Sequence, residues 1–270
     1  MRHSLLLALI PITAALQMSH AEELRIPLSL PSGLYMDAAW KDDWPGCSYE
    51  DGIAEGRVEL VEREGTAALR ILYPPKGVGS NKSGAGWRFP FKRQESGEVH
   101  YTLRFDEDFD FVKGGKLPGL CGGPETITGG DKVTGLDGFS ARLMWRADGH
   151  AEAYLYHMNQ PDKYGDQIPF PEDFRFPRGE PIQIRLQVVM NTLEERDGQL
   201  RVWVKLASDS EPQLVVEKTD LEWRATFDYG VDSLLFNTFY GGSGKEWAPT
   251  KPQHAEFSDF RIVFPAVIEP

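Results

Sequence analysis

Cysteine is scarce in this chain, which has only two cysteines, Cys47 and Cys121, among 270 residues. Two cysteines cannot form a zinc site by themselves, and the sequence contains no CxxC pair. Two alternatives stay open for them, a Cys47–Cys121 disulfide or a pair of buried thiols. The sequence does not decide between these alternatives, because it does not show whether the residues approach within bonding distance.

Basic residues are outnumbered, since 29 Lys and Arg stand against 41 Asp and Glu and the net charge is −12. A surface of this charge does not attract nucleic acid or anionic lipid as a whole. We therefore expect no nucleic-acid partner. Any anionic ligand must bind at a local basic patch.

Long apolar runs are confined to the N-terminus, where Arg2 precedes the run 5–16 and small residues lead to Ala21. This pattern is typical of a secretory signal, and the run is short for a bilayer span. We predict a cleaved signal over residues 1–21 and a secreted or periplasmic chain, with an N-terminal anchor as the alternative. No membrane association is expected after cleavage, and a disulfide could persist in such a compartment.

Linkers, internal repeats and helical periodicity are also missing, so residues 22–270 are predicted to form one domain. Apolar and polar residues alternate instead, which is typical of strands with one buried face. The segments with this alternation or another strand-like pattern are 99–105, 139–145, 182–190, 200–206, 214–217, 233–239 and 257–264. We expect an all-β antiparallel sandwich of jelly-roll type.

One predicted β-hairpin places four polar side chains on a common face. A two-residue loop would pair Arg142 with Leu155 and mix polar with apolar groups. A three-residue loop pairs Arg142 with Tyr154 and Ser140 with Tyr156, and every apolar residue then lies on the opposite face. The pattern therefore favours the three-residue loop.

The polar face of this hairpin has the chemistry to bind a carboxylate. A guanidinium can hold a carboxylate by two parallel hydrogen bonds, and it favours ionisation of a neighbouring phenol. The alternative is an ordinary exposed face, because strands commonly carry Tyr–Arg cross-strand pairs.

A second segment, residues 113–123, has five glycines in eleven residues around Lys116. A phosphate-binding loop would need Ser or Thr after its Gly-Lys pair, but Leu117 follows Lys116. The glycines indicate instead that the backbone packs tightly or is approached closely. A solvated side chain is the plain alternative for Lys116.

These motifs together resemble the signature of polysaccharide lyase family 14, which includes alginate and glucuronic-acid-polymer lyases, and that of the related glucuronan lyases. The resemblance covers roughly residues 95–265. It is carried by Gly-Gly-Lys-Leu-Pro-Gly-Leu at 114–120, Ser-x-Arg at 140–142, Tyr-x-Tyr at 154–156, Phe-Tyr-Gly-Gly at 239–242 and Trp-Ala-Pro at 247–249.

The resemblance implies a cleft across one sheet and a secreted enzyme that cuts a 1,4-linked polyuronate, alginate or glucuronan, by β-elimination. The product would carry a 4,5-unsaturated uronate at its new non-reducing end. The implied catalytic residues are Lys116, Ser140, Arg142, Tyr154 and Tyr156. Which of Lys116 and the two tyrosines is the base and which the acid stays open. The scheme needs no cofactor or metal, its partner is the anionic polysaccharide, and we expect a monomer.

Four further residues are candidate substrate contacts, namely Asn237, Tyr240, Lys245 and Trp247. Aromatic rings can stack on sugars, although packing in the core or at its rim is the default for Tyr and Trp. Two other functions stay open: a non-catalytic carbohydrate-binding jelly roll and, less favoured, a glycoside hydrolase. A hydrolase needs two carboxylates, and no second acid has an evident position near Glu152.

Overall fold

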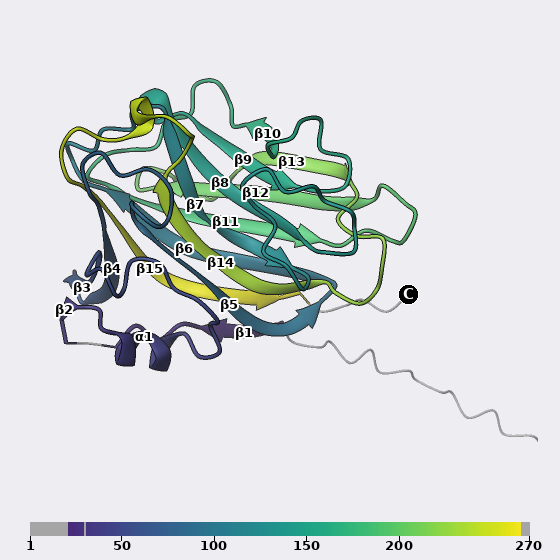
Figure 1. Ribbon diagram of the computed structural model, residues 1–270, viewed down its shortest axis with the longest axis horizontal. Helices are drawn as coiled ribbons and strands as arrows, with labels where there is room; N and C mark the ends of the chain where they lie inside the picture. The colour runs from purple at the N-terminus through teal and green to yellow at the C-terminus, as the bar shows by residue number, and fades with distance from the viewer. Residues whose placement is uncertain (1–20, 30, 266–270) are drawn as a thin grey trace, which may run out of the picture.

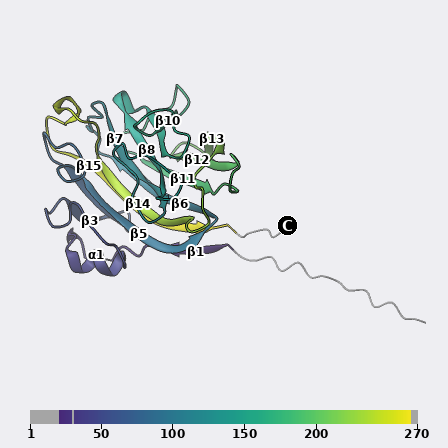
Figure 2. The same ribbon diagram turned by 45° about the vertical axis from the view of Figure 1, so that its right-hand side comes forward.

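Two antiparallel sheets pack face to face in the computed structural model, which describes residues 21–29 and 31–265 (Figures 1 and 2). The predicted signal peptide lies outside the described residues, apart from Ala21. Within the described part, no helix is both long and apolar enough to cross a membrane.

The larger sheet has nine strands in the order β13-β12-β11-β6-β15-β4-β3-β2, and β1 pairs with β15 beside them. Its strands are β1 (Glu22–Arg25), β2 (Gly33–Leu34), β3 (Val58–Arg63), β4 (Thr66–Tyr73), β6 (Ser96–Phe105), β11 (Pro181–Val189), β12 (Gly198–Leu206), β13 (Gln213–Leu221) and β15 (Gln253–Phe264).

The smaller sheet has six strands in the order β10-β9-β8-β7-β14-β5. They are β5 (Ala85–Gln94), β7 (Gly114–Gly122), β8 (Phe139–Arg146), β9 (Ala151–Tyr156), β10 (Asp166–Pro169) and β14 (Val231–Tyr240), and the helical segments are α1 (Asp37–Asp43), η1 (Ala147–Gly149) and η2 (Lys245–Trp247). The prediction of a jelly-roll-type β-sandwich is confirmed.

The period of two in the sequence decides which side chains enter the core between the sheets. In β6, Val99, Leu103 and Phe105 are fully buried, whereas His100 and Thr102 between them are only half-buried. The same alternation holds along β11 and β12, since each side chain points to the opposite face from its neighbour. Each sheet therefore keeps an outer face that can carry polar side chains.

The N-terminal segment is anchored by Trp44, which follows α1 directly. Its ring lies in edge contact with Trp87 and Phe89 of the smaller sheet, at centroid distances of 5.3 and 5.6 Å, and with Phe260 of the larger sheet at 5.4 Å. Edge contacts of this kind stabilise a core beyond the area that they bury. Trp44 therefore ties the segment before β3 to both sheets.

Cys47 and Cys121 are both free thiols, so the disulfide alternative is not formed. Cys47 packs against the core between the sheets. Leu120 also belongs to that core, and Cys121 follows it on β7, so the Cys121 side chain points to the other face of the strand. Burial raises the pKa of Cys47 to about 12 and that of Cys121 to about 11.

Candidate active site

The hairpin of β8 and β9 has the register that the three-residue loop predicts. Arg142 pairs with Tyr154, and Ser140 pairs with Tyr156. The loop closes through Asp148 and Gly149, which both have left-handed backbones with φ of 58° and 80°. The prediction that these polar side chains share one face is confirmed by this pairing.

Lys116 reaches the same face because β7 lies directly beside β8. Lys116 pairs with Met144 of β8 on one side and with Phe239 of β14 on the other. A Cβ atom on Gly115 would lie 2.0 Å from the ring of Trp145, and one on Gly119 would lie 2.0 Å from the carbonyl oxygen of Ala141. The glycines therefore let β7 pack closely against its neighbours, as the sequence predicts. This packing fixes the backbone position of Lys116.

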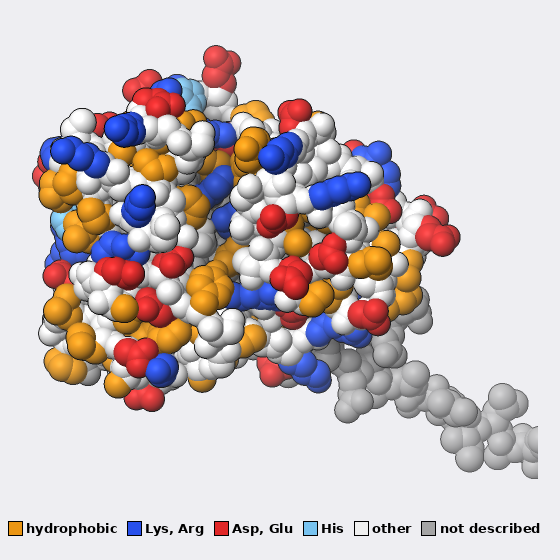
Figure 3. Space-filling view, viewed as in Figure 1, with side chains coloured by type: hydrophobic (Ala, Val, Ile, Leu, Met, Phe, Trp, Pro, Cys, Tyr) orange, Lys and Arg blue, Asp and Glu red, His pale blue; other side chains and the backbone are white. Residues whose placement is uncertain are grey.

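A cavity of about 880 Å³ opens on the outer face of the smaller sheet. The same face is hollowed in Figure 3, with Lys and Arg side chains in the depth of the hollow. The lining comprises Tyr49, Asp51, Ser80, Lys116, Thr126, Thr128, Gly129, Arg142, Met144, Arg146, Tyr154, Tyr156, Tyr164, Gln167, Asn237, Phe239, Gly242, Ser243 and Trp247. Four of the five predicted catalytic residues therefore meet in one cavity.

The Lys116 amine is buried without a carboxylate partner in the described chain. The residue is 8% exposed, and its Nζ lies 2.7 Å from Sδ of Met144 and 2.9 Å from the ring centroid of Tyr154. Burial, reinforced by the charges of Arg142 and Arg146, holds the pKa of Lys116 well below its usual range. A neutral amine is a Brønsted base, which an ordinary surface lysine at neutral pH is not.

Arg142 is a second buried cation and is only 1% exposed. One of its terminal nitrogens donates to Oδ1 of Asn237 at 3.2 Å, whereas its Nε has no hydrogen-bond partner among the described residues. Burial lowers the pKa of Arg142, yet a guanidinium stays protonated in proteins. An unpaired buried donor of this kind is costly, and the Arg142 side chain lines the cavity that an anion can enter.

The two tyrosines lie side by side with their ring centroids 5.7 Å apart. The hydroxyl of Tyr156 accepts a hydrogen bond of 2.8 Å from the backbone N–H of Gly130. Burial, followed by the neighbouring Tyr156, raises the pKa of Tyr154 above the usual phenol range. Tyr154 therefore stays protonated at ordinary pH and is suited to donate a proton.

Ser140 differs from the other predicted catalytic residues because it does not line the cavity. It is fully buried, and its hydroxyl donates to the carbonyl of Ile127 at 2.7 Å. This bond fixes the loop between β7 and β8, which also carries Gly130. The structure gives Ser140 a positioning contact, whereas the resemblance implies a catalytic role for it.

The four candidate substrate contacts divide evenly. Asn237 and Trp247 line the cavity, whereas Tyr240 and Lys245 do not. Tyr240 is fully buried in the core, where its ring lies 5.3 Å from that of Trp145. The strand period explains this correction, since Tyr240 is three residues from Asn237 and therefore faces the other side of β14. Lys245 lies exposed on η2.

Several residues that line the cavity are not among the site residues predicted from the sequence. Arg146 and Met144 continue the polar face of β8 at the same period as Arg142, so the period of two already indicated them. Arg146 donates to Oε1 of Glu152 at 2.6 Å. Tyr49 lies in the loop between α1 and β3, far in sequence from the other site residues, and no local pattern indicates that it lines the cavity.

Comparisons with known proteins show which family and which fold the chain is similar to. The chain matches the family model Polysaccharide lyase 14 over residues 61–260. The PL-14 alginate lyase of Aplysia kurodai has a similar structure, with 26% identity and a TM-score of 0.76 over 90% of this chain and 98% of that one. The endo-β-1,4-glucuronan lyase of Trichoderma reesei shares the fold, with 14% identity and a TM-score of 0.54 over 82% and 92% of the two chains.

Among curated proteins, Exolysin of Paramecium bursaria Chlorella virus 1 is 24% identical over 220 residues, which are 71% of this chain and 32% of Exolysin. The match therefore spans about a third of the length of that relative. The family model covers well over half of the present chain. The chain belongs to polysaccharide lyase family 14.

Proposed function

We propose that this chain is a polyuronate lyase that cuts a 1,4-linked polymer by β-elimination in the cavity on the smaller sheet. One observation carries the proposal, namely that Lys116 and Arg142 are both buried in the cavity without a carboxylate partner in the described chain. The guanidinium of Arg142, which no carboxylate neutralises in the described chain, gives the cavity a positive charge that suits an anionic substrate, and Lys116 adds a buried amine beside it.

The reaction needs three groups, because the proton on C5 of a uronate is poorly acidic while the adjacent carboxylate stays charged. We propose that Arg142 neutralises this carboxylate and stabilises the enolate-like intermediate. A base then takes the C5 proton, the electron pair forms the C4=C5 double bond, and the C4–O4 bond breaks. An acid delivers a proton to the departing O4.

Lys116 is the base in our proposal, and Tyr154 is the acid. The lowered pKa of Lys116 supports the first role, and the position of the protonated Tyr154 phenol beside Lys116 supports the second. Nζ of Lys116 lies over the Tyr154 ring, so both groups reach the same small volume. Asn237 orients Arg142, and Tyr156 supports the loop at Gly130.

The proposed substrates are alginate and glucuronan. The name of the Aplysia enzyme supports alginate, and that of the fungal enzyme supports glucuronan. A glycoside hydrolase is less well supported, because in the described chain Asp51 is the one carboxylate that lines the cavity. Hydrolysis of a glycosidic bond ordinarily uses two.

The test is to incubate the full chain separately with polymannuronate, polyguluronate and glucuronan and to follow the ultraviolet absorbance of the conjugated double bond. A rise on any one polymer, lost in Lys116→Ala and Tyr154→Phe, supports the proposal and names the substrate. Reducing ends without absorbance would indicate a hydrolase. Saturable binding without either product would indicate a carbohydrate-binding protein and overturn the lyase assignment.

A further inference from the structure

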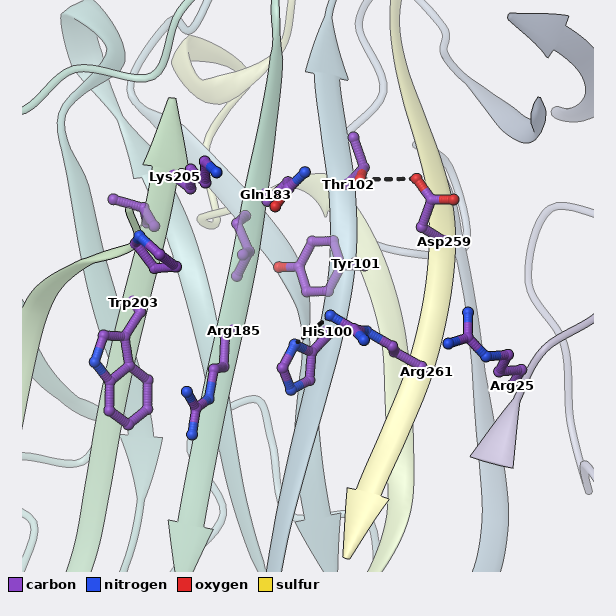
Figure 4. Close-up of a pocket in the computed structure, with 13 residues that line it drawn as sticks. Arg25, His100, Tyr101, Thr102, Gln183, Arg185, Trp203, Lys205, Asp259 and Arg261 are labelled. Atoms are coloured by element: carbon purple, nitrogen blue, oxygen red, sulfur yellow. Dashed lines mark hydrogen bonds between the residues drawn. The ribbon is translucent and has the colours of Figure 1, made fainter. Parts of the chain in front are cut away.

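The outer face of the larger sheet carries a row of side chains that crosses five adjacent strands. Trp203 of β12 pairs with Arg185 of β11, and Arg185 pairs with His100 of β6. His100 pairs with Arg261 of β15, and Arg261 pairs with Arg25 of β1. Figure 4 shows these five side chains side by side across the strands. Adjacent strands are ~4.8 Å apart, so the row spans roughly 19 Å.

This row forms one wall of a groove of about 360 Å³ that the proposed catalytic chemistry does not use. Four Lys and Arg side chains line the groove, against a single acidic one, Asp259. Asp259 is turned toward Thr102, whose hydroxyl donates to it at 2.9 Å (Figure 4). Lys205 has no ion-pair partner among the described residues and stands beside Gln183, which pairs with it across the strands.

Two carboxylates beside the row form ion pairs with its arginines. Glu98 contacts Arg185 at 2.6 Å and also lies 3.0 Å from His100, and Glu23 contacts Arg25 at 2.5 Å and lies 3.8 Å from Arg261. The guanidinium groups keep further donors, because each has five N–H groups. The Arg185 and Arg261 side chains remain 37% and 41% exposed. The cations are therefore oriented and still accessible.

Trp203 gives the row an apolar platform at one end. The guanidinium carbon of Arg185 lies 4.1 Å from the centroid of its ring, and the tryptophan is half-buried on an otherwise polar strand face. An aromatic ring at the end of a row of guanidinium groups is suited to a ligand with both a sugar ring and carboxylates. The charge of the groove is complementary to such a ligand, although the whole chain carries −12.

We propose that this groove is a second, non-catalytic binding site for a polyuronate chain, with Trp203 stacking on a sugar ring and the cations binding its carboxylates. The choice of polymer rests on the proposed function of the cavity. The groove and the cavity lie on the outer faces of opposite sheets with the core between them. A bound polymer in the groove therefore leaves the cavity open and raises the concentration of cleavable chain near it.

The binding test uses the full chain with Lys116→Ala, which prevents cleavage, and isothermal titration with long polyuronate. Trp203→Ala in this background is expected to weaken binding to the second site about tenfold. Lys205→Gln, whose change touches no ion pair, is expected to weaken it about threefold. Lys92→Gln is the matched control, because it removes one exposed charge that forms no ion pair among the described residues and lies on β5, outside both the groove and the cavity.

The kinetic test uses the active chain with the same groove variants. We expect a raised KM on long polymer, an unchanged kcat, and no change on a trisaccharide. Equal polymer affinity in Trp203→Ala, Lys205→Gln and the control would overturn the inference, and so would equal binding of an uncharged polysaccharide. If the wild-type chain forms no double bond on any polyuronate, the proposed function fails. That result is separate from the test of the groove, because the titration measures polymer binding without cleavage.

Discussion

Lys116→Met tests the proposed mechanism most directly, because it should abolish turnover without destabilising the fold. Lys116 is 8% exposed, and its amine has a thioether and an aromatic ring as its close neighbours. Methionine has a similar length, suits such surroundings and carries no charge. The substitution therefore removes the proposed base together with the cost of burying an amine.

The pH dependence follows from the lowered pKa of Lys116 in the folded chain. Between that pKa and the ordinary lysine pKa of about 10.4, the unfolded chain binds more protons than the folded one. The free energy of unfolding of the wild type therefore decreases as pH falls through this window, from about 10.4 to the lowered pKa of Lys116. The Lys116→Met variant has no amine at this position and does not show this decrease. At pH 7 roughly one ordinary lysine in 2,500 is neutral, and each unit of lowering raises that fraction tenfold.

The measurements are initial rates from double-bond absorbance and melting temperatures, both between pH 5 and 10. The variant should lose about 10²–10⁴-fold in kcat, the usual contribution of a general base. Its Tm advantage over the wild type should grow as pH falls through the window. Lys113→Met, three residues away with a half-exposed side chain, should change neither quantity. Retention of most of the turnover, or a lower Tm at every pH, would refute the reasoning.

Three further predictions concern the surroundings of the cleft and the thiols. Arg146→Gln should raise the pKa of the buried lysine and move the acidic limb of the pH–rate profile to higher pH, whereas Glu152→Gln should move it to lower pH. Asn237→Ala should lower kcat about 10²-fold with little change in Tm, measured on one polymer, because Arg142, the arginine proposed to bind the substrate carboxylate, loses its fixed position. A reducing agent should leave Tm unchanged, and Cys47 and Cys121 should react slowly with a thiol reagent at pH 8, because both are free and their pKa values are raised.

The hairpin of β8 and β9 shows why part of the site could be predicted from the sequence. Its two strands are adjacent in the chain, and a register slip of one residue would bring polar side chains into the core. That constraint selects the pairing of Arg142 with Tyr154, which the structure confirms. The local sequence pattern is sufficient to predict the register of a hairpin when the turn length and the requirement for one buried face select the same pairing.

The rest of the site depends on contacts that no local pattern contains. Arg142 and Asn237 are 95 residues apart in the sequence, and their hydrogen bond requires the order β8-β7-β14 within the sheet. An irregularity between Leu117 and Leu120 lets both leucines face the core although they are three residues apart. Strands β1 to β5 carry weaker alternation and were not predicted individually. The signal peptide stays a prediction.

The cleft is electrostatically incomplete without a ligand, and this follows from how its cations are arranged. The nearby acid, Glu152, is engaged by Arg146, so it does not neutralise Lys116 or Arg142. The lowered pKa of Lys116 gives this side chain a route to relieve the cost of burial by releasing its proton, whereas the guanidinium of Arg142 has no such route. Asp51 also lines the cavity but forms no ion pair with Lys116 or Arg142 among the described residues, so an anionic ligand can supply the missing counter-charge. A uronate carboxylate would supply it at the position where elimination requires neutralisation, so the same interaction that binds the polymer would also acidify its C5 proton.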